Sequence, residues 1–295
     1  MQTIESLKRK IKSAEDLRSV VSTMKALAAV SIRQYEKAVE SLAEYNRTVE
    51  MGFQIVLKQN PRGVSMAQPV LNGRLGAVVF GSDQGMAGQF NEVIARYAVN
   101  KMDELRIMAE NRTLLAVGLR VLARLEEAGH PVEDLVYLPD SLAAITPIVQ
   151  EMVLKIEAWR FQREIDRFVL FFNRPISGAS YRPHTLYLLP VDPGWFQNLE
   201  HKPWPCRALP FFTMDWDKLF SLLIREYLFV SLYRAVAESL ASENASRLAS
   251  MQAAEKNIED RLEELKAQFH QQRQISIDEE LFDLVAGFEA VTQAG

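Results

Sequence analysis

The chain has 295 residues, 48% of them hydrophobic and 24% charged, a composition typical of folded proteins rather than disordered ones. Its formal net charge of −4 gives no reason to expect nucleic acid as the main partner. The single cysteine, Cys206, excludes an internal disulfide and a clustered Cys/His zinc site, and it fits a reducing, cytoplasmic compartment. No signal peptide and no apolar run of about 20 residues is visible, so we expect any work at a membrane to go through a partner.

Residues 1–60 show the heptad pattern of a coiled-coil helix. In a register with position a at Ile4, every d position and five of the eight a positions are apolar. That is thirteen of sixteen positions, against about eight expected from the composition. The polar a residues, Arg18, Lys25 and Asn46, are expected to fix the register at some cost in stability. The d positions are Leu7, Ala14, Val21, Ala28, Tyr35, Leu42, Val49 and Val56.

Residues 73–212 are expected to form an α/β domain. The first helix should end at Asn60-Pro61-Arg62-Gly63, because proline cannot continue a helix and glycine suits a turn. Beyond a linker to Gly73, strands alternate with helical stretches, which predicts a mostly parallel, Rossmann-like sheet whose last two strands form an antiparallel pair. The five apolar runs that predict strands are Leu75–Phe80, Thr113–Val117, Asp134–Leu138, Phe168–Phe172 and Thr185–Leu189.

The helices of this domain are expected at about Gln89–Met108, up to Glu127, and from a cap at Ser141 to about Arg163. The last part of the domain, residues 190–212, is rich in prolines and aromatic residues, and this composition argues against a regular helix there. We favour an ordered connector packed on the sheet over an aromatic ligand groove.

Residues 213–295 predict a second long helix. No proline occurs from Asp217 to Ala290, and helical residues in that number would span on the order of 100 Å. Asp215 and Asp217 are both suitable N-caps. Small residues between Ala235 and Ala254 would let two helices approach closely. The predicted architecture is therefore an antiparallel coiled coil of the first and last helices with the α/β domain inserted between them. The end of the second helix, from about Ile275, is expected to project beyond its partner.

No catalytic constellation stands out in the sequence, so we expect no catalytic residue, cofactor or metal. The histidines are dispersed, and none is paired with an obvious nucleophile or metal ligand. The one Gly-rich loop, residues 81–91, follows a predicted strand, but Gly81, Gly85 and Gly88 fit neither a dinucleotide-binding nor a P-loop spacing. A structural turn or a protein-contact loop is favoured over nucleotide binding. The four histidines are His130, His184, His201 and His270.

Three stretches resemble one known family. LKRKIKSAEDLRSVVSTMKALAAVSI (7–32) is similar to the opening helix of the gamma subunit of F-type ATP synthases, the central rotor shaft. GSDQGMAGQFN (81–91) is similar to a loop that the family usually writes SDRGLCGGFN. LFVSLYRAVAESLASENASRLASMQAAEKN (228–257), continued by RQISIDEELFDLVAG (273–287), resembles the family's closing helix.

The resemblance implies a non-catalytic subunit that couples ion flow through a membrane ring to conformational cycling of catalytic beta subunits. The helices would stand inside a ring of alternating alpha and beta subunits, and the α/β domain would rest on the membrane c-ring beside the epsilon subunit. The complex would lie on the cytoplasmic face of the plasma membrane, with a single copy of this chain. The implied beta contacts are Met24, Lys25, Arg247, Arg273, Gln274 and Asp278, and the implied foot contacts are Asp83, Gln84 and Gly85.

The sequence departs from the family pattern at several positions. Gln84 stands where the family usually has arginine, Ala87 where it has cysteine and Gln89 where it has glycine. Asp278 replaces a hydroxyl near the end of the last helix. These departures favour a divergent branch, such as the alternative, often sodium-linked ATPase of some bacteria and archaea.

Two other classes of function stay open on the residues alone. A Rossmann-like nucleotide-binding enzyme with coiled-coil oligomerisation arms would bind a nucleotide at Gly85 to Gly88. A coiled-coil scaffold protein would form a stable homo-oligomer in isolation.

Overall fold

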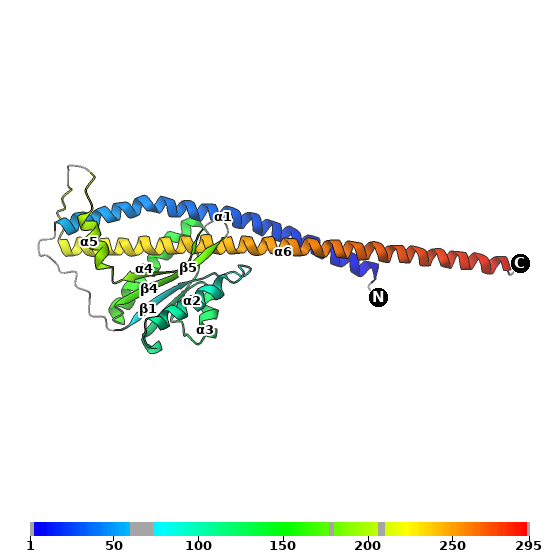
Figure 1. The fold of residues 1–295 in the computed structure, drawn as a ribbon, viewed down its shortest axis with the longest axis horizontal. Helices are drawn as coiled ribbons and strands as arrows, with labels where there is room; N and C mark the ends of the chain where they lie inside the picture. Colours follow the sequence, from blue (N-terminus) through cyan, green and yellow to red (C-terminus); the bar gives the residue numbers. More distant parts are fainter. Residues whose placement is uncertain (1–2, 60–72, 177–179, 206–209, 294–295) are drawn as a thin grey trace. The chain divides into compact units, whose positions relative to one another are not determined.

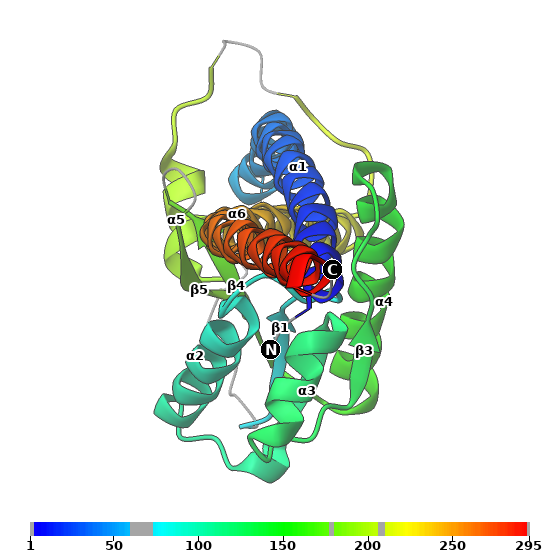
Figure 2. The ribbon, with the colours of Figure 1, turned by 90° about the vertical axis from the view of Figure 1, so that its right-hand side faces the viewer.

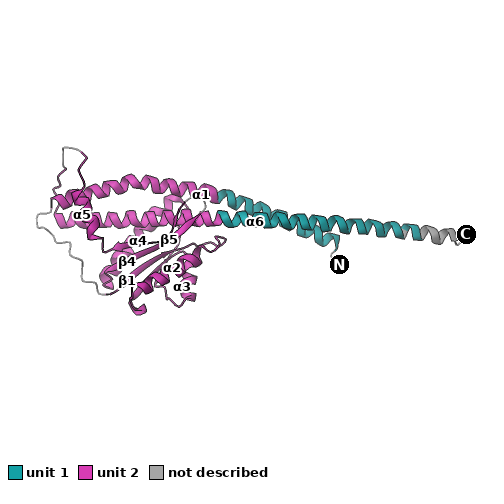
Figure 3. Cartoon of the chain, viewed as in Figure 1, with its two compact units in different colours: residues 1–27, 248–295 teal, residues 28–247 magenta. Residues whose placement is uncertain are grey.

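The computed structural model describes residues 3–59, 73–176, 180–205 and 210–293. Two long helices, α1 (Ile4–Lys58) and α6 (Trp216–Gln293), flank an α/β region in the sequence (Figure 1). The chain divides into two compact units, residues 28–247 and residues 1–27 with 248–295 (Figure 3). The expected turn at Asn60–Gly63 and Cys206 lie outside the described residues.

The two long helices pack against each other in antiparallel order within each unit. In the smaller unit, Arg18 Nη2 lies 2.8 Å from Glu259 Oε1, and Glu15 Oε1 lies 3.5 Å from Lys266 Nζ. In the larger unit, the Trp216 indole N–H donates to the Val56 carbonyl at 3.0 Å. Residues near the start of α1 therefore meet residues near the end of α6, and residues near the end of α1 meet the start of α6. The two helices are antiparallel, as the sequence predicts. Six of the eight d residues are buried and two are half-buried: Leu7, Val21, Ala28, Tyr35, Val49 and Val56, with Ala14 and Leu42.

The polar residues at a positions have specific partners. Lys25 pairs with Glu255 of α6 and Arg18 pairs with Glu259, so two charged a residues meet carboxylates across the seam. The Asn46 amide donates to Glu50 Oε1 at 2.8 Å within α1. The two interhelical ion pairs would be lost if one helix slid past the other, so Arg18 and Lys25 help to define the register.

A five-stranded mixed sheet forms the centre of the larger unit. Its order is β3-β2-β1-β4-β5, in which β1, β2, β3 and β4 are parallel and β5 is antiparallel to β4. This confirms the predicted parallel sheet and the antiparallel last pair. All six residues of β1 are buried, as expected for a central strand covered on both faces. The strands are β1 (Leu75–Phe80), β2 (Arg112–Val117), β3 (Asp134–Val136), β4 (Arg167–Pro175) and β5 (Tyr181–Leu189).

Helices cover both faces of the sheet (Figure 2). One face packs against α2 (Phe90–Glu104) and α3 (Leu119–Glu127). The other face packs against α4 (Ile145–Gln162) and α6. Because α6 lies between the sheet and α1 in this unit, every residue from 235 to 246 is buried. Alanine and serine dominate this stretch, which allows the close approach of neighbours on all sides.

The structure corrects two local expectations and decides between the two N-caps expected for the last helix. The helix expected to reach Met108 ends at Glu104, and a short 3₁₀ turn, η1 (Ala109–Asn111), follows. Ser141 does not cap α4, because a 3₁₀ turn, η2 (Leu142–Ala144), intervenes and the Ser141 side chain makes no capping bond. At the start of α6, Asp215 Oδ1 accepts from the backbone N–H groups of residues 217 and 218, so Asp215 is the N-cap.

The connector after β5 contains a regular helix, contrary to the expectation that its composition argues against one. This helix, α5 (Pro193–His201), begins where the Asp192 carboxylate accepts from the Gly194 N–H at 2.9 Å and proline occupies the first turn. Its aromatic side chains pack on α1 and α6 rather than on the sheet. The Phe53 ring lies 5.5 Å from both Trp195 and Phe196, centroid to centroid.

Candidate functional site

The Gly-rich loop after β1 is held in place by bonds within the chain. The Asp83 carboxylate accepts from the backbone N–H of Leu119 at 2.8 Å and from that of Leu138 at 2.7 Å. The Asn91 side chain accepts from the Ser82 N–H at 2.9 Å and donates to the Ser82 hydroxyl at 2.8 Å. The loop therefore ties together the segments that follow β1, β2 and β3 at the carboxyl edge of the sheet.

The glycines here serve close packing. A Cβ at Gly81 would lie 2.3 Å from Val121 Cβ and 2.6 Å from Asn91 Oδ1. Gly118 has φ +110°, and its Cβ would lie 2.9 Å from the Ser82 backbone. A side chain at Gly81 or Gly118 would therefore clash with neighbouring protein atoms, whereas Gly85 meets only Arg120, at 3.6 Å or more. Of the three predicted foot contacts, Asp83 is committed to internal bonds, whereas Gln84 is exposed and Gly85 is half-buried.

Buried hydroxyl groups of α6 bond to backbone carbonyls of the α/β region. The Ser246 hydroxyl donates to the Ala87 carbonyl at 2.6 Å, and the Ser242 hydroxyl donates to the Asn173 carbonyl at 3.0 Å. Ser239, one turn earlier, is equally buried, but its hydroxyl has no hydrogen-bond partner. Two of these three serines therefore give directional contacts that apolar burial alone does not supply.

A buried ion pair lies in the same part of α6. Arg247 Nη2 lies 2.5 Å from Glu243 Oε1, and Arg247 also donates to Asn244 Oδ1 at 3.2 Å. Burial raises the pKa of the Glu243 carboxyl, and the Arg247 charge opposes that rise. Burial also raises the pKa of the Tyr35 hydroxyl, with the Glu243 charge adding to the effect. Arg247, a predicted beta contact, is therefore bonded within its own chain.

The other predicted beta contacts lie in the smaller unit and differ in exposure. Met24 is half-buried, and Lys25 pairs with Glu255. Arg273, Gln274 and Asp278 are exposed on α6. They follow Phe269, whose ring centroid lies 5.9 Å from Lys8 Nζ of α1.

The described end of α6 carries large apolar side chains that no part of the unit covers. Leu281, Phe282 and Leu284 are 57%, 74% and 75% exposed. Large exposed apolar side chains gathered in one stretch are typical of interaction surfaces. The sequence indicated an uncovered helix end, since the second helix was expected to project beyond the first from about Ile275.

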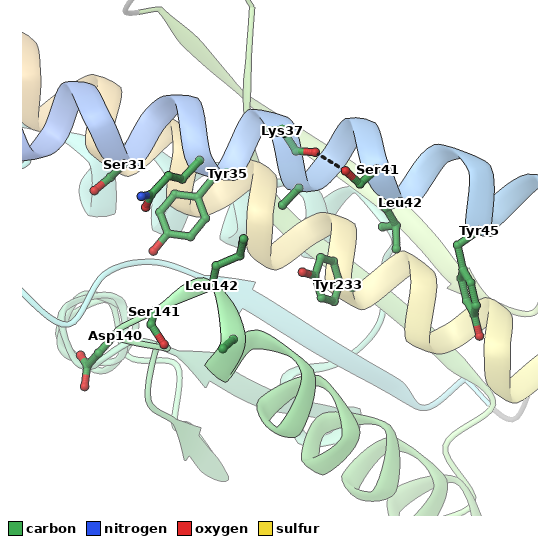
Figure 4. Close-up of a pocket in the computed structure, with 13 residues that line it drawn as sticks. Ser31, Tyr35, Lys37, Ser41, Leu42, Tyr45, Asp140, Ser141, Leu142 and Tyr233 are labelled. Carbon is green, nitrogen blue, oxygen red and sulfur yellow. Dashed lines mark hydrogen bonds between the residues drawn. The ribbon is translucent and has the colours of Figure 1, made fainter.

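An open groove of about 860 Å³ lies in the larger unit and was not predicted (Figure 4). One wall is α1, from Ser31 to Tyr45, and the other is the segment Asp140–Ala143 that leads into α4. Tyr233 of α6 also lines it. Hydroxyl and apolar groups line most of the groove. No sequence signal could have revealed it, because it depends on how two distant segments face each other.

The described residues offer no centre for metal chemistry. Across residues 3–59, 73–176, 180–205 and 210–293, no group of three or more His, Cys, Asp or Glu side chains could hold a metal ion. Within the same ranges, no helix is long and apolar enough to cross a membrane. His184, packed edge to face on Phe172, has its pKa lowered by burial and by the nearby Arg174.

Comparison with known proteins decides the family. A family model described as ATP synthase matches residues 3–291, nearly the whole chain. The chain belongs to the ATP synthase gamma chain family. The gamma chain of Polynucleobacter asymbioticus is 25% identical over 99% of this chain and 100% of its own length. The gamma chain of Brevibacillus brevis is 28% identical over 97% of this chain and 98% of its own.

Solved structures show the same fold. The rotor of the Euglena gracilis mitochondrial ATP synthase aligns with a TM-score of 0.64 at 14% identity, covering 93% of this chain and 98% of that one. The central stalk and c-ring structure from Tetrahymena thermophila aligns with a TM-score of 0.56 at 19% identity, covering 80% and 99%.

The family assignment confirms the central-stalk, or rotor, role and makes the chain a non-catalytic subunit of a membrane ATP synthase. It therefore excludes the nucleotide-binding enzyme and the homo-oligomeric scaffold. The divergent, sodium-linked branch stays a prediction.

Proposed function

We propose that this gamma chain couples ion flow through a membrane c-ring to the conformational cycle of catalytic beta subunits. The observation that carries the proposal is the antiparallel pairing of α1 with α6 in a chain that matches the gamma family over residues 3–291. A shaft that turns inside a ring of alternating alpha and beta subunits acts by differential contact. Each tenfold change in nucleotide affinity at a beta subunit requires about 1.4 kcal/mol of such contact.

The residues proposed to touch beta subunits fall into two groups. Arg273, Gln274 and Asp278 are exposed and have free polar groups to offer a partner. Lys25 and Arg247 already bind Glu255 and Glu243, so they would meet a beta subunit by exchanging one carboxylate for another. Met24 would contribute an apolar contact beside Lys25. A guanidinium or ammonium group facing an acidic lever has the right sign for attraction.

The loop at the carboxyl edge of the sheet is proposed to meet the foot partners, the epsilon subunit and the c-ring. Gln84 is exposed and available, whereas Asp83 would act by holding the loop in shape. Gly85 would allow a close approach of the partner's backbone. We place the complex on the cytoplasmic face of the plasma membrane, with one copy of this chain among three copies each of alpha and beta.

The contacts at the end of α6 are tested in the assembled complex. Arg273→Ala with Gln274→Ala should lower ATP-driven ion pumping about tenfold, a loss of ~1.4 kcal/mol of contact. Gln271→Ala, at another exposed position of the same stretch, is the control and should pump like the parent. Unchanged pumping and assembly in the double variant would show that these two residues do not contact beta subunits.

A separate measurement tests the coupling role itself. A tagged form of this chain, purified from its own cell, should bring down two larger ATPase subunits in a 1:3:3 ratio and a membrane ring. The purified complex should pump ions when it hydrolyses ATP. A complex that lacks the ring, or that hydrolyses ATP without pumping, would contradict the proposed coupling.

A further inference from the structure

Three arginines gather on the α6 side of the sheet, at its β5 edge. Arg174 lies in β4, Arg182 in β5 and Arg234 in α6. We call these three residues, with His184 and Glu238 beside them, the arginine patch. All five lie in the larger unit, where β4, β5 and α6 adjoin (Figure 1).

The patch contains a like-charge pair in the sheet itself. Arg174 and Arg182 are direct partners across the antiparallel strands β4 and β5. Like charges at directly opposite positions destabilise a sheet. The Arg174–Arg182 pair is therefore an unfavourable choice for folding by itself.

One buried carboxylate serves two of the arginines. Glu238 is 4% exposed; its Oε2 lies 3.4 Å from Arg174 Nε and its Oε1 lies 2.8 Å from Arg234 Nε. Burial and the nearby Arg174 lower the pKa of His184, the remaining titratable side chain of the patch. Three guanidinium groups and one carboxylate leave the patch with two uncompensated positive charges.

Arg182 has the least compensated charge. It is exposed, and no carboxylate of the described chain lies within ion-pair distance of it. The side chains of Arg174 and Arg234 are also 38% and 49% exposed, so their outer faces stay accessible while Glu238 holds their inner faces. The patch is thus a fixed array of guanidinium groups, oriented from below by a buried carboxylate and open on its outer side.

We propose that the arginine patch binds an acidic segment of another subunit of the ATP synthase. The chemistry favours carboxylates because the planar guanidinium fork matches a carboxylate with two parallel hydrogen bonds. Glu238 already bridges two of these arginines, one through each carboxylate oxygen and each through a guanidinium Nε. This inference rests on the proposed function, since the occupant comes from the same complex.

An anionic membrane surface is the less favoured occupant. Segments that bind anionic lipid usually gather about four to eight basic residues, each contributing about 1 kcal/mol. Two uncompensated charges are too few for that mode, yet they suffice to orient one acidic segment within a larger interface.

Zero-length cross-linking in the purified complex tests the proposal. Arg182→Lys keeps the positive charge and adds an amine, which a carbodiimide joins to a carboxylate in direct contact. We expect a peptide cross-linked through position 182 to an Asp or Glu of another subunit. Arg96→Lys is the matched control, since Arg96 is exposed on α2, on the opposite face of the sheet, and also has no ion pair within the described chain. Position 96 should give no cross-link to the segment that is joined to position 182.

Charge reversal gives a second readout. Arg182→Glu should lower the apparent affinity of the subunit for the rest of the complex about tenfold at low salt, and the difference should shrink at high salt. Arg96→Glu should leave the affinity unchanged.

The outcomes separate the two levels of inference. No cross-link from position 182, or one to Glu238 alone, in a complex that assembles would overturn the acidic-segment proposal. Binding of the isolated chain to phosphatidylglycerol vesicles that is lost in Arg182→Glu would overturn it in favour of a membrane. Failure of the parent chain to purify with the other subunits would instead contradict the proposed function.

Discussion

Two stretches of α6 are helical to the same degree but have opposite surroundings. In residues 235–246, every position is buried between α1 and the sheet, and the side chains are mostly alanine and serine. In residues 273–286, nearly every described position is exposed, although the stretch is rich in isoleucine, leucine and phenylalanine. Hydrophobic composition therefore fails to predict burial here. The small side chains of the first stretch fit the narrow space between α1 and the sheet, and the second stretch is the one we propose to meet a partner subunit.

The largest expected effect comes from placing a charge in the buried stretch. Ala241 is 1% exposed, and Ala241→Glu would bury a carboxylate with no partner and no room. We expect a loss of about 4–5 kcal/mol or more in the free energy of unfolding. Ala286→Glu, at an exposed position of the same helix, should change it by less than about 0.5 kcal/mol. Urea unfolding followed by circular dichroism measures both free energies. Equal losses would show that the two stretches of α6 do not differ in their surroundings.

A buried and an exposed ion pair of α6 should differ in how their contribution to stability depends on pH. Arg247→Leu leaves Glu243 buried without its counter-charge and should cost about 3–5 kcal/mol at pH 8. Burial already raises the pKa of Glu243 in the folded chain, and loss of Arg247 raises it further. The unfolded chain ionises first as pH rises, so the stability deficit should be small at pH 4 and grow above the unfolded pKa.

A solvent-exposed pair provides the control for that experiment. Arg261 Nη1 lies 2.5 Å from Glu264 Oε2, and both side chains are more than half exposed. Arg261→Leu should cost less than about 1 kcal/mol at either pH, because solvent screens the pair. A deficit in Arg247→Leu that does not depend on pH would argue against an ionised, buried Glu243.

The smallest expected effect distinguishes buried hydroxyls of the same type. Ser246→Ala removes one of two donors to the Ala87 carbonyl, which keeps its bond from the Phe90 N–H, and should cost about 0.5–1.5 kcal/mol. Ser239→Ala removes a buried hydroxyl that has no partner, so stability should be unchanged or slightly raised. The two serines lie about two turns apart on the same helix, and thermal unfolding of the two variants measures the loss of stability in each. A larger loss in Ser239→Ala would reverse the assignment.

The coiled coil and the sheet could be predicted from sequence because each follows a local period. The heptads from Ile4 located the seam of α1, and the run Leu75–Phe80 gave the exact bounds of β1. The heptad test describes one neighbouring helix, however. It could not show that Ala235–Ser246 also meets a sheet, since that requires knowing where a distant domain lies.

Other features were missed although a signal was present. Asp192 followed by Pro193 is a sound helix start, and it was outweighed by the prolines and aromatic residues around it.

The arginine patch had no signal of its own, because Arg174, Arg182 and Arg234 come together only through strand pairing and helix packing. The partner contacts proposed for Arg273 and Gln274 come from family resemblance alone, and both residues are exposed.

Asp83 shows how a loop can keep its shape while its surroundings drift. Both carboxylate oxygens bind backbone N–H groups, those of Leu119 and Leu138, rather than side chains. Any residue except proline supplies the same donor at those two positions, so a substitution there leaves both bonds to Asp83 possible. In a chain that shares about a quarter of its residues with a relative such as the Polynucleobacter asymbioticus gamma chain, one acidic side chain can thus hold three loops together through changes in two of them.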